Sequence, residues 1–217
     1  MKPLLILTLV ICQAFPACSQ NNATNKKAAT DLIVGDGCEG CEAIHECPVP
    51  FDQLNNVDTL PDFDQPGPKI EISGTIFHSD GKTPAKDVVL YVYHTDQTGV
   101  YPTRGNEKGW ARRHGYLRGW LKTGADGKYK FYTLVPASYP DSRAPKHIHP
   151  TIKEPGIAEY WIDEYLFADD PYLQQENQNR PPRGGNGVLK PEMKDGMLRA
   201  TRDIVLGQNV PGYPKAK

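Results

Sequence analysis

Short runs of alternating residues, separated by turn signals, constrain the fold of this chain more than any other feature. Ile70, Ile72 and Ile76 alternate with polar neighbours, and a turn at 79–84 precedes a β-branched and aromatic run at 88–93. Residues two apart share one face of a strand, so this spacing predicts strands with one buried face. The 20 glycines and 20 prolines favour frequent turns. Together these features predict an all-β sandwich with long irregular loops.

Three more segments have strand character. A tight hairpin signal, Asp126-Gly127, leads into 128–133, where Tyr129 and Phe131 share one face. We also expect strands at 147–152 and 200–206, and a short helix at 160–167. Two long segments, 102–121 and 169–194, interrupt the pattern, and we interpret the second as a lid or mobile loop.

The N-terminal part of the chain has the composition of a targeting segment and a tether. Residues 1–17 combine Lys2, a short apolar run and small residues at Ala14 and Ala17, which is typical of a signal peptide. Cys18 follows at a position that resembles a lipoprotein processing site, and 18–30 is polar enough for a flexible tether. We therefore expect an exported protein that is lipid-anchored in the bacterial cell envelope, with a periplasmic or secreted protein as the alternative. An irregular N-terminal arm, 31–67, then precedes one β-sandwich domain, 68–217.

Charge and hydropathy limit the partners. A formal net charge of −1 over 217 residues gives no electrostatic reason to expect nucleic acid. No internal apolar run is long enough for a membrane-spanning helix, so membrane contact is expected only through a lipid on Cys18.

Three cysteines of the arm have no role in targeting. Cys38, Cys41 and Cys47 lie close together, and in an exported protein a disulfide is favoured over free thiols. A zinc knuckle that includes His45 is the alternative, although no second cysteine pair lies at zinc-finger spacing. The pairing stays open at this point.

Two histidines and two tyrosines form a candidate metal site. His147 and His149 are two residues apart, so on a strand both imidazoles project from one face. Tyr139 lies eight residues before His147, and Tyr101 lies in another turn. A set of phenols and imidazoles suits Fe(III). Zinc sites typically use thiolates with imidazoles, and calcium sites use carboxylates.

The order of these motifs carries a family resemblance. The segments 89–101, 123–133 and 136–140, followed by His147-Ile148-His149, resemble the intradiol ring-cleavage dioxygenases, the class of protocatechuate and catechol dioxygenases. The resemblance implies Fe(III) held by Tyr101, Tyr139, His147 and His149, a catechol and O2 as substrates, and a muconate-type product. It also implies that Tyr139 leaves the metal and takes a catechol proton, and that the chain forms a homo-oligomer.

One position departs from that family. Ala144 stands where the family usually has an arginine that steadies the substrate, and Arg143 is one residue upstream. Because Pro145 predicts an irregular loop, we retain Arg143 as a candidate catalytic residue. Arg104, Arg113 and Arg118 are candidate substrate-binding residues, and a solvated loop is the alternative for that segment.

A different class of protein remains possible from the sequence. The strand and turn pattern also resembles carboxypeptidase-regulatory-like sandwiches, which are non-catalytic binding modules of exported proteins. Such a module explains the strands but not the paired histidines. A zinc hydrolase would use His147 and His149, but no carboxylate is an obvious third ligand. Burgundy colour from tyrosinate-to-Fe(III) charge transfer would distinguish the dioxygenase from a colourless binding module.

Overall fold

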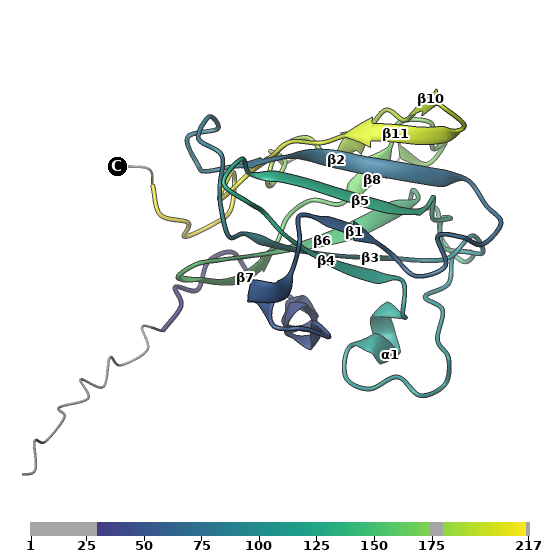
Figure 1. Ribbon diagram of the computed structural model, residues 1–217, viewed down its shortest axis with the longest axis horizontal. Coiled ribbons are helices and arrows are strands. Elements are labelled where there is room, and N and C mark those ends of the chain that lie inside the picture. The colour runs from purple at the N-terminus through teal and green to yellow at the C-terminus, as the bar shows by residue number, and fades with distance from the viewer. Residues whose placement is uncertain (1–29, 174–179, 216–217) are drawn as a thin grey trace, which may run out of the picture.

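The computed structural model describes residues 30–173 and 180–215, which form two stacked β-sheets (Figure 1). The predicted signal peptide, Cys18 and all but the last residue of the predicted tether lie outside the described residues, as does 174–179 of the second long loop. The predictions made for those segments stay predictions. The described part confirms the all-β sandwich.

The first sheet contains the alternating isoleucines. Its strands run in the order β1-β5-β2-β11-β10, and β12 also pairs with β2. Ile70, Ile72 and Ile76 of β2 are fully buried, as the alternation predicts. The bounds are β1 Val57–Thr59, β2 Lys69–Phe77, β5 Lys128–Leu134, β10 Glu192–Lys194, β11 Met197–Thr201 and β12 Ile204–Val205.

The second sheet contains the paired histidines. Its strands run in the order β4-β3-β6-β8-β9, and β7 pairs with β6. In Figure 1, β3, β4, β6 and β7 of this sheet form the lower layer, and helix α1 (Ala111–His114) lies below them, away from the first sheet. The bounds are β3 Val89–His94, β4 Arg118–Lys122, β6 His147–Glu154, β7 Ile157–Trp161, β8 Tyr165–Phe167 and β9 Val188–Leu189.

The core lies between the sheets, and it is built from the inward positions of the strands. Leu90 and Val92 of β3 and Ile148 of β6 face Phe131 of β5 and the isoleucines of β2. Burial of apolar side chains from both sheets is the main favourable contribution to folding. Because alternate residues point inward, the residues between them are left on the outer face, where the candidate site lies.

Three local predictions from the sequence are wrong. In place of the expected helix at 160–167, β7 ends at Trp161, a short connection follows, and β8 begins at Tyr165. The expected last strand at 200–206 is two strands, β11 and β12, which pair with successive parts of β2. Asp126-Gly127 does form a turn, but it joins β4 to β5 across the two sheets instead of closing a hairpin. Segment 102–121 also ends in a strand, since β4 begins at Arg118.

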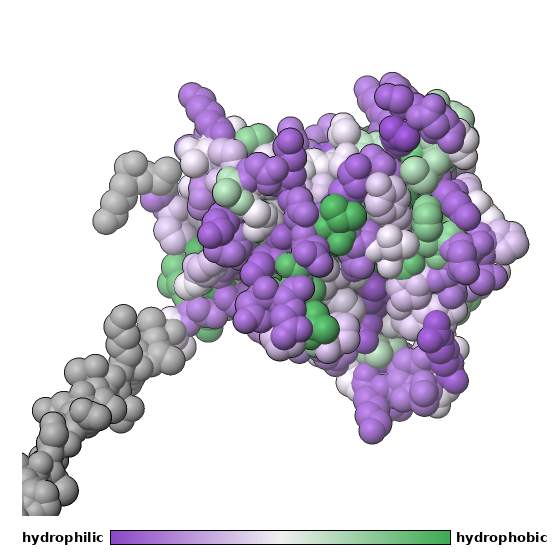
Figure 2. Space-filling view, viewed as in Figure 1, coloured by the Kyte–Doolittle hydropathy of each residue, from purple (hydrophilic) through white to green (hydrophobic). Residues whose placement is uncertain are grey.

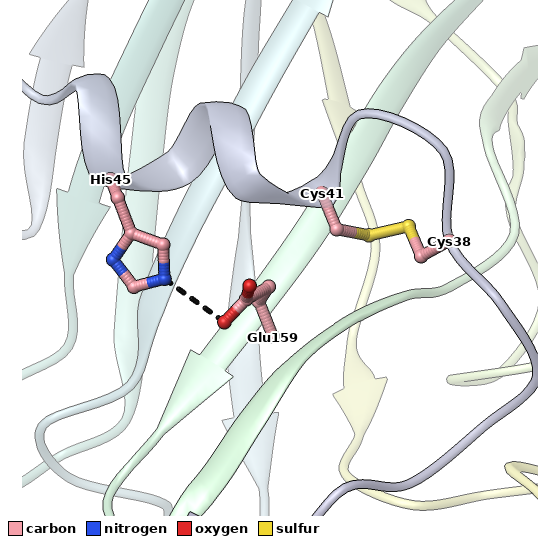
Figure 3. The surroundings of a disulfide bond; sticks show 4 residues. All are labelled: Cys38, Cys41, His45 and Glu159. Carbon is pink, nitrogen blue, oxygen red and sulfur yellow. Dashed lines mark hydrogen bonds and ion pairs between the residues drawn. A yellow bond between two sulfur atoms is a disulfide. The ribbon is translucent and has the colours of Figure 1, made fainter.

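The arm is more ordered than the sequence predicts. It contains two short 3₁₀ helices, η1 (Cys41–Glu46) and η2 (Phe51–Gln53), and its strand β1 joins the first sheet parallel to β5. Figure 3 shows the start of η1, where Cys38 and Cys41 form a disulfide. His45 of the same helix bonds Glu159 of β7 at 2.9 Å, so the arm is attached to the second sheet. The disulfide excludes the zinc knuckle.

We expect the disulfide to stabilise the arm modestly. The bridge joins residues three apart, and closing so short a loop contributes about 2 kcal/mol through the entropy of the unfolded chain. Cys38→Ser should therefore lower the free energy of unfolding in urea by about that amount. Cys47→Ser is the control, because Cys47 takes no part in a disulfide within the described residues. Equal midpoints for the wild type and Cys38→Ser would contradict the expectation.

The face of the molecule seen in Figure 2 is mainly polar. Figure 2 shows hydrophobic side chains dispersed among hydrophilic ones on the face in view. Within 30–173 and 180–215, no helix has the length and apolar character needed to cross a bilayer.

Candidate metal centre

Strand β6 places two imidazoles on the outer face of the second sheet. His147 and His149 flank Ile148, whose side chain is fully buried in the core. Their Nε2 atoms are 3.0 Å apart. The two-residue period of a strand accounts for this arrangement, because alternate side chains leave opposite faces.

Two loops bring the tyrosines to the same point. Tyr101 follows a turn in which the Asp96 carboxylate accepts bonds from the backbone N–H groups of Thr98 and Val100. Tyr139 follows β5, and the two phenol oxygens are 2.5 Å apart. The Tyr101 oxygen lies 2.8 Å from Nε2 of His149, and the Tyr139 oxygen lies 3.1 Å from Nε2 of His147.

Gly99 allows the two loops to approach each other. It has a φ of +81°, and a Cβ built there would lie 2.1 Å from the carbonyl oxygen of Ser138. Glycine is the residue that tolerates both conditions. The contact joins the loop of Tyr101 to the residue directly before Tyr139.

The donor set fits a bound cation. Nδ1 of His147 lies 2.6 Å from the carbonyl oxygen of Pro145, so it donates and leaves the Nε2 lone pair directed at the cluster. Nε2 of His149 also faces the cluster, 2.8 Å from the Tyr101 oxygen, and Nδ1 on the far side of the ring lies 3.8 Å from the Glu164 carboxylate. The two phenols can share one O–H···O hydrogen bond at 2.5 Å, but the two Nε2 atoms lie 3.0 Å apart with their lone pairs facing each other. A shared metal ion would relieve this repulsion, and a hydrogen bond that orients the ring from its far side, as the Pro145 carbonyl does for His147, is typical of histidines that bind metals.

Burial opposes charge on Tyr101, Tyr139 and His149. Desolvation is the largest cause that raises the pKa of Tyr101 and of Tyr139. Desolvation, followed by the neighbouring His147, lowers the pKa of His149 far below its usual range. Phenolates would therefore need a nearby positive charge, which a metal ion supplies. Elsewhere in the described ranges, no three or more His, Cys, Asp or Glu side chains are grouped to hold a metal.

An aromatic stack supports His149, and sequence reasoning missed it. The ring of Tyr93 lies parallel to His149 at 4.6 Å between centroids and parallel to His114 at 3.7 Å. Nδ1 of His114 in turn bonds the hydroxyl of Tyr91 at 2.9 Å. Tyr91 and Tyr93 are two residues apart on β3, and this spacing was the available signal in the sequence.

The side chain of His94 points into the protein interior and not toward the four-residue cluster. Its side chain is fully buried, and its nitrogens bond the carbonyl oxygen of Thr95 and the hydroxyl of Thr133, each at 2.7 Å. Burial lowers the pKa of His94 to about 4, so its ring is neutral. It is a hydrogen-bonded core residue.

The four predicted arginines lie outside the cluster. Arg104 stacks on Tyr116 and lies 4.0 Å from Asp62, Arg113 pairs with Glu39, and Arg118 bonds Glu46 at 2.7 Å. Arg143 is exposed on the loop between Tyr139 and His147. The substrate-binding and catalytic roles predicted for them gain no support from these contacts, and they stay predictions.

The fold and the candidate ligands together indicate a class of protein: a β-sandwich with a candidate metal centre of two histidines on one sheet and two tyrosines on adjacent loops. The family model of the dioxygenases, described as "Dioxygenase", matches residues 40–180. This chain belongs to the intradiol ring-cleavage dioxygenase family, as the motifs predicted. The match favours the dioxygenase interpretation over the binding-module alternative.

Individual relatives agree with the family. Catechol 1,2-dioxygenase 1 of Acinetobacter lwoffii is 41% identical over 88 residues, which are 41% of this chain and 27% of the relative. The chain thus spans about a quarter of that protein. Among solved structures, the dioxygenase domain of a dioxygenase carbohydrate-binding fusion from Streptomyces sp. SirexAA-E is similar with a TM-score of 0.56 and 24% identity, covering 73% of this chain and 94% of that one. Catechol 1,2-dioxygenase from an Acinetobacter species has a TM-score of 0.53 and 20% identity, covering 69% and 56%. These two structures bear on the fold alone.

Proposed function

We propose that this protein binds Fe(III) through Tyr101, Tyr139, His147 and His149 and cleaves a catechol ring between its two hydroxylated carbons with O2. The convergence of the four donor atoms at distances of 2.5 to 3.4 Å carries the proposal. Both atoms of O2 enter the muconate-type product, so the reaction needs no external reductant. Bound Fe(III) would supply the Lewis acidity that makes the catechol acidic and its ring reactive toward O2.

The protein's own contribution begins with proton transfer. The oxygen of Tyr139 belongs to a loop residue and lies 3.1 Å and 3.4 Å from the two imidazoles. As a phenolate it is suited to accept a proton from a catechol hydroxyl and to return that proton later.

Positioning is the second contribution. The carbonyl of Pro145 fixes the ring of His147, and the stacked ring of Tyr93 restrains that of His149. Tyr101 is restrained by the turn that Asp96 organises. Ligands that are restrained before the metal binds lose little entropy on binding.

The proposal is tested by loading the protein with iron. Protein refolded or dialysed with Fe(III) should bind one iron per chain, turn burgundy and take up O2 when catechol is added, with loss of the catechol absorbance. Chelation of the iron should bleach the colour and lower the melting temperature, because a ligand that binds only the folded state stabilises it. A colourless, iron-free protein after loading would rule out the four-residue centre.

A further inference from the structure

Asp170 carries a buried carboxylate at the start of the long segment 169–194, shortly after the end of β8. The residue is only 6% exposed. Within the described residues its carboxylate forms no ion pair, because Nζ of the nearby Lys146 bonds Asp169 instead, at 2.9 Å. A buried carboxylate is costly unless hydrogen bonds replace its lost water, so the partners of Asp170 show what this residue holds in place.

The Asp170 carboxylate accepts hydrogen bonds from three parts of the chain. Oδ2 accepts from the backbone N–H of Lys146 at 2.9 Å and from the hydroxyl of Ser138 at 3.3 Å. Oδ1 accepts from the backbone N–H two residues further along its own segment, at 2.8 Å. Ser138 and Lys146 are the residues directly before Tyr139 and His147, two of the four candidate ligands. One carboxylate therefore links the two backbone stretches that carry these ligands.

The bond to Lys146 acts on His147 through a single peptide group. The N–H of Lys146 and the carbonyl of Pro145 belong to the same planar, trans peptide unit. The N–H of this unit donates to Asp170, and its carbonyl oxygen accepts from Nδ1 of His147 at 2.6 Å. Hydrogen bonds joined in this way polarise one another, so a carboxylate on the N–H side makes the carbonyl oxygen a stronger acceptor.

This acceptor holds both the proton and the ring of His147. A proton on Nδ1 leaves the lone pair on Nε2, which lies 3.1 Å from the Tyr139 oxygen and 3.0 Å from Nε2 of His149. A carboxylate or a backbone carbonyl commonly accepts the second N–H of a metal-binding histidine, and it fixes the tautomer and the orientation of the ring. Here a carboxylate and a carbonyl act in series.

Ser138, the other partner, lies where the two tyrosine loops meet. Its carbonyl oxygen is the atom that a Cβ at Gly99 would strike, and its hydroxyl bonds Asp170. The carboxylate thus also supports the junction between the loops of Tyr101 and Tyr139. At 3.3 Å this bond is long, so the larger effect is expected through Lys146.

We propose that Asp170 is a positioning residue of the metal centre. Its carboxylate, acting through the peptide group between Pro145 and Lys146, holds His147 in the tautomer and orientation that bind the metal. This inference rests on the proposed function for the identity of the metal. It gives a role to the start of segment 169–194, which is anchored beside the metal centre at this residue. Loss of a partner of this kind typically lowers metal affinity by about 10- to 100-fold.

The test compares two neighbouring aspartates that bond the same lysine in different ways. Asp169→Asn removes a charge that pairs with the side chain of Lys146, and Asp170→Asn removes one that bonds its backbone N–H. Each variant is titrated with Fe(III) in competition with a chelator. Asp170→Asn should bind iron about 10-fold more weakly, since an amide oxygen polarises the peptide group less, and Asp170→Ala up to about 100-fold more weakly. Asp169→Asn should stay within about 2-fold of the wild type, because this exposed ion pair contributes little.

The metal-free protein supplies a second readout that is independent of iron. Nitrogen chemical shifts of the His147 imidazole, assigned by their loss in His147→Gln, report which nitrogen carries the proton. The wild type and Asp169→Asn should show the Nδ1–H tautomer, and Asp170→Ala should show an increased share of the Nε2–H form. Melting temperatures of all variants verify folding, and Asp170→Asn decides the question if Asp170→Ala does not fold.

A lower melting temperature of the Asp170 variants with wild-type tautomer and wild-type iron affinity would show a purely structural role and overturn the inference. Equal losses of iron affinity in Asp169→Asn and Asp170→Asn would also overturn it. Absence of iron binding in the wild type would instead refute the proposed function. In that case the tautomer comparison would still decide whether Asp170 orients His147.

Discussion

Tyr139→Phe should lower kcat for ring cleavage by about 10²–10⁴-fold, the usual contribution of a positioned general acid or base. The substitution removes one oxygen from a ring that is half-buried and packed edge-on against His147. Tyr101 and both imidazoles stay in place, so the fold is expected to persist. The visible band of the iron-loaded protein should shift or weaken, since one of its two tyrosinates is lost.

Stopped-flow or oxygen-electrode rates, together with the visible spectrum and iron content, measure this outcome. Tyr132→Phe is the matched control: it also removes a hydroxyl from a tyrosine of the β5 region, but that residue is outside the four-donor cluster. It should retain colour and turnover. If Tyr139→Phe kept both wild-type colour and wild-type kcat, the role of Tyr139 as ligand and base would be wrong.

Gly99→Ala should disrupt the metal centre without touching a metal ligand. The added Cβ meets the carbonyl oxygen of Ser138 at 2.1 Å, and backbone on both sides must shift to accommodate it. The left-handed conformation adds about 1–2 kcal/mol for a residue with a side chain, and overpacking typically adds a further 1–3 kcal/mol. Because Tyr101 and Tyr139 lie on the two loops that separate, iron affinity should fall along with stability.

Gly105→Ala is the control for this prediction. Gly105 has a similar φ of +89°, but nothing lies within 4 Å of its built Cβ. It therefore carries the conformational cost of about 1–2 kcal/mol without the collision. Urea unfolding and iron titration of both variants separate the two effects. Equal loss of stability and equal iron affinity in the two variants would mean that the approach of the loops is unimportant.

Local periodicity was sufficient to predict much of this protein. The alternation of Ile70, Ile72 and Ile76 predicted β2 with its buried face, and the spacing of His147 and His149 predicted two imidazoles on one side of a strand. Such patterns succeed because they depend only on the geometry of a single strand. The family resemblance brought Tyr101 and Tyr139 to the same site, which no local pattern could do.

Local patterns failed where neighbouring strands decide the conformation. Most of segment 160–167 forms strands because the edge of β6 that does not pair with β3 bonds β7 along one part and β8 along another. Asp126-Gly127 makes the turn that its residues favour, but the packing of the two sheets determines that β4 and β5 are in different layers. Tertiary context commonly overrides local preference in strands, because their hydrogen-bond partners are remote in sequence.

The sequence by itself determined the class of fold, the order of the four candidate ligands and the family, since these depend on residue type and spacing along the chain. Only the tertiary structure decided the environment of the site. It placed Tyr93 on His149, drew the arginines into ion pairs and left Glu164 beside the centre without a basic partner within the described residues. The physical reason is that electrostatics and packing act between atoms that are close in space, and residues far apart in sequence supply most of those neighbours.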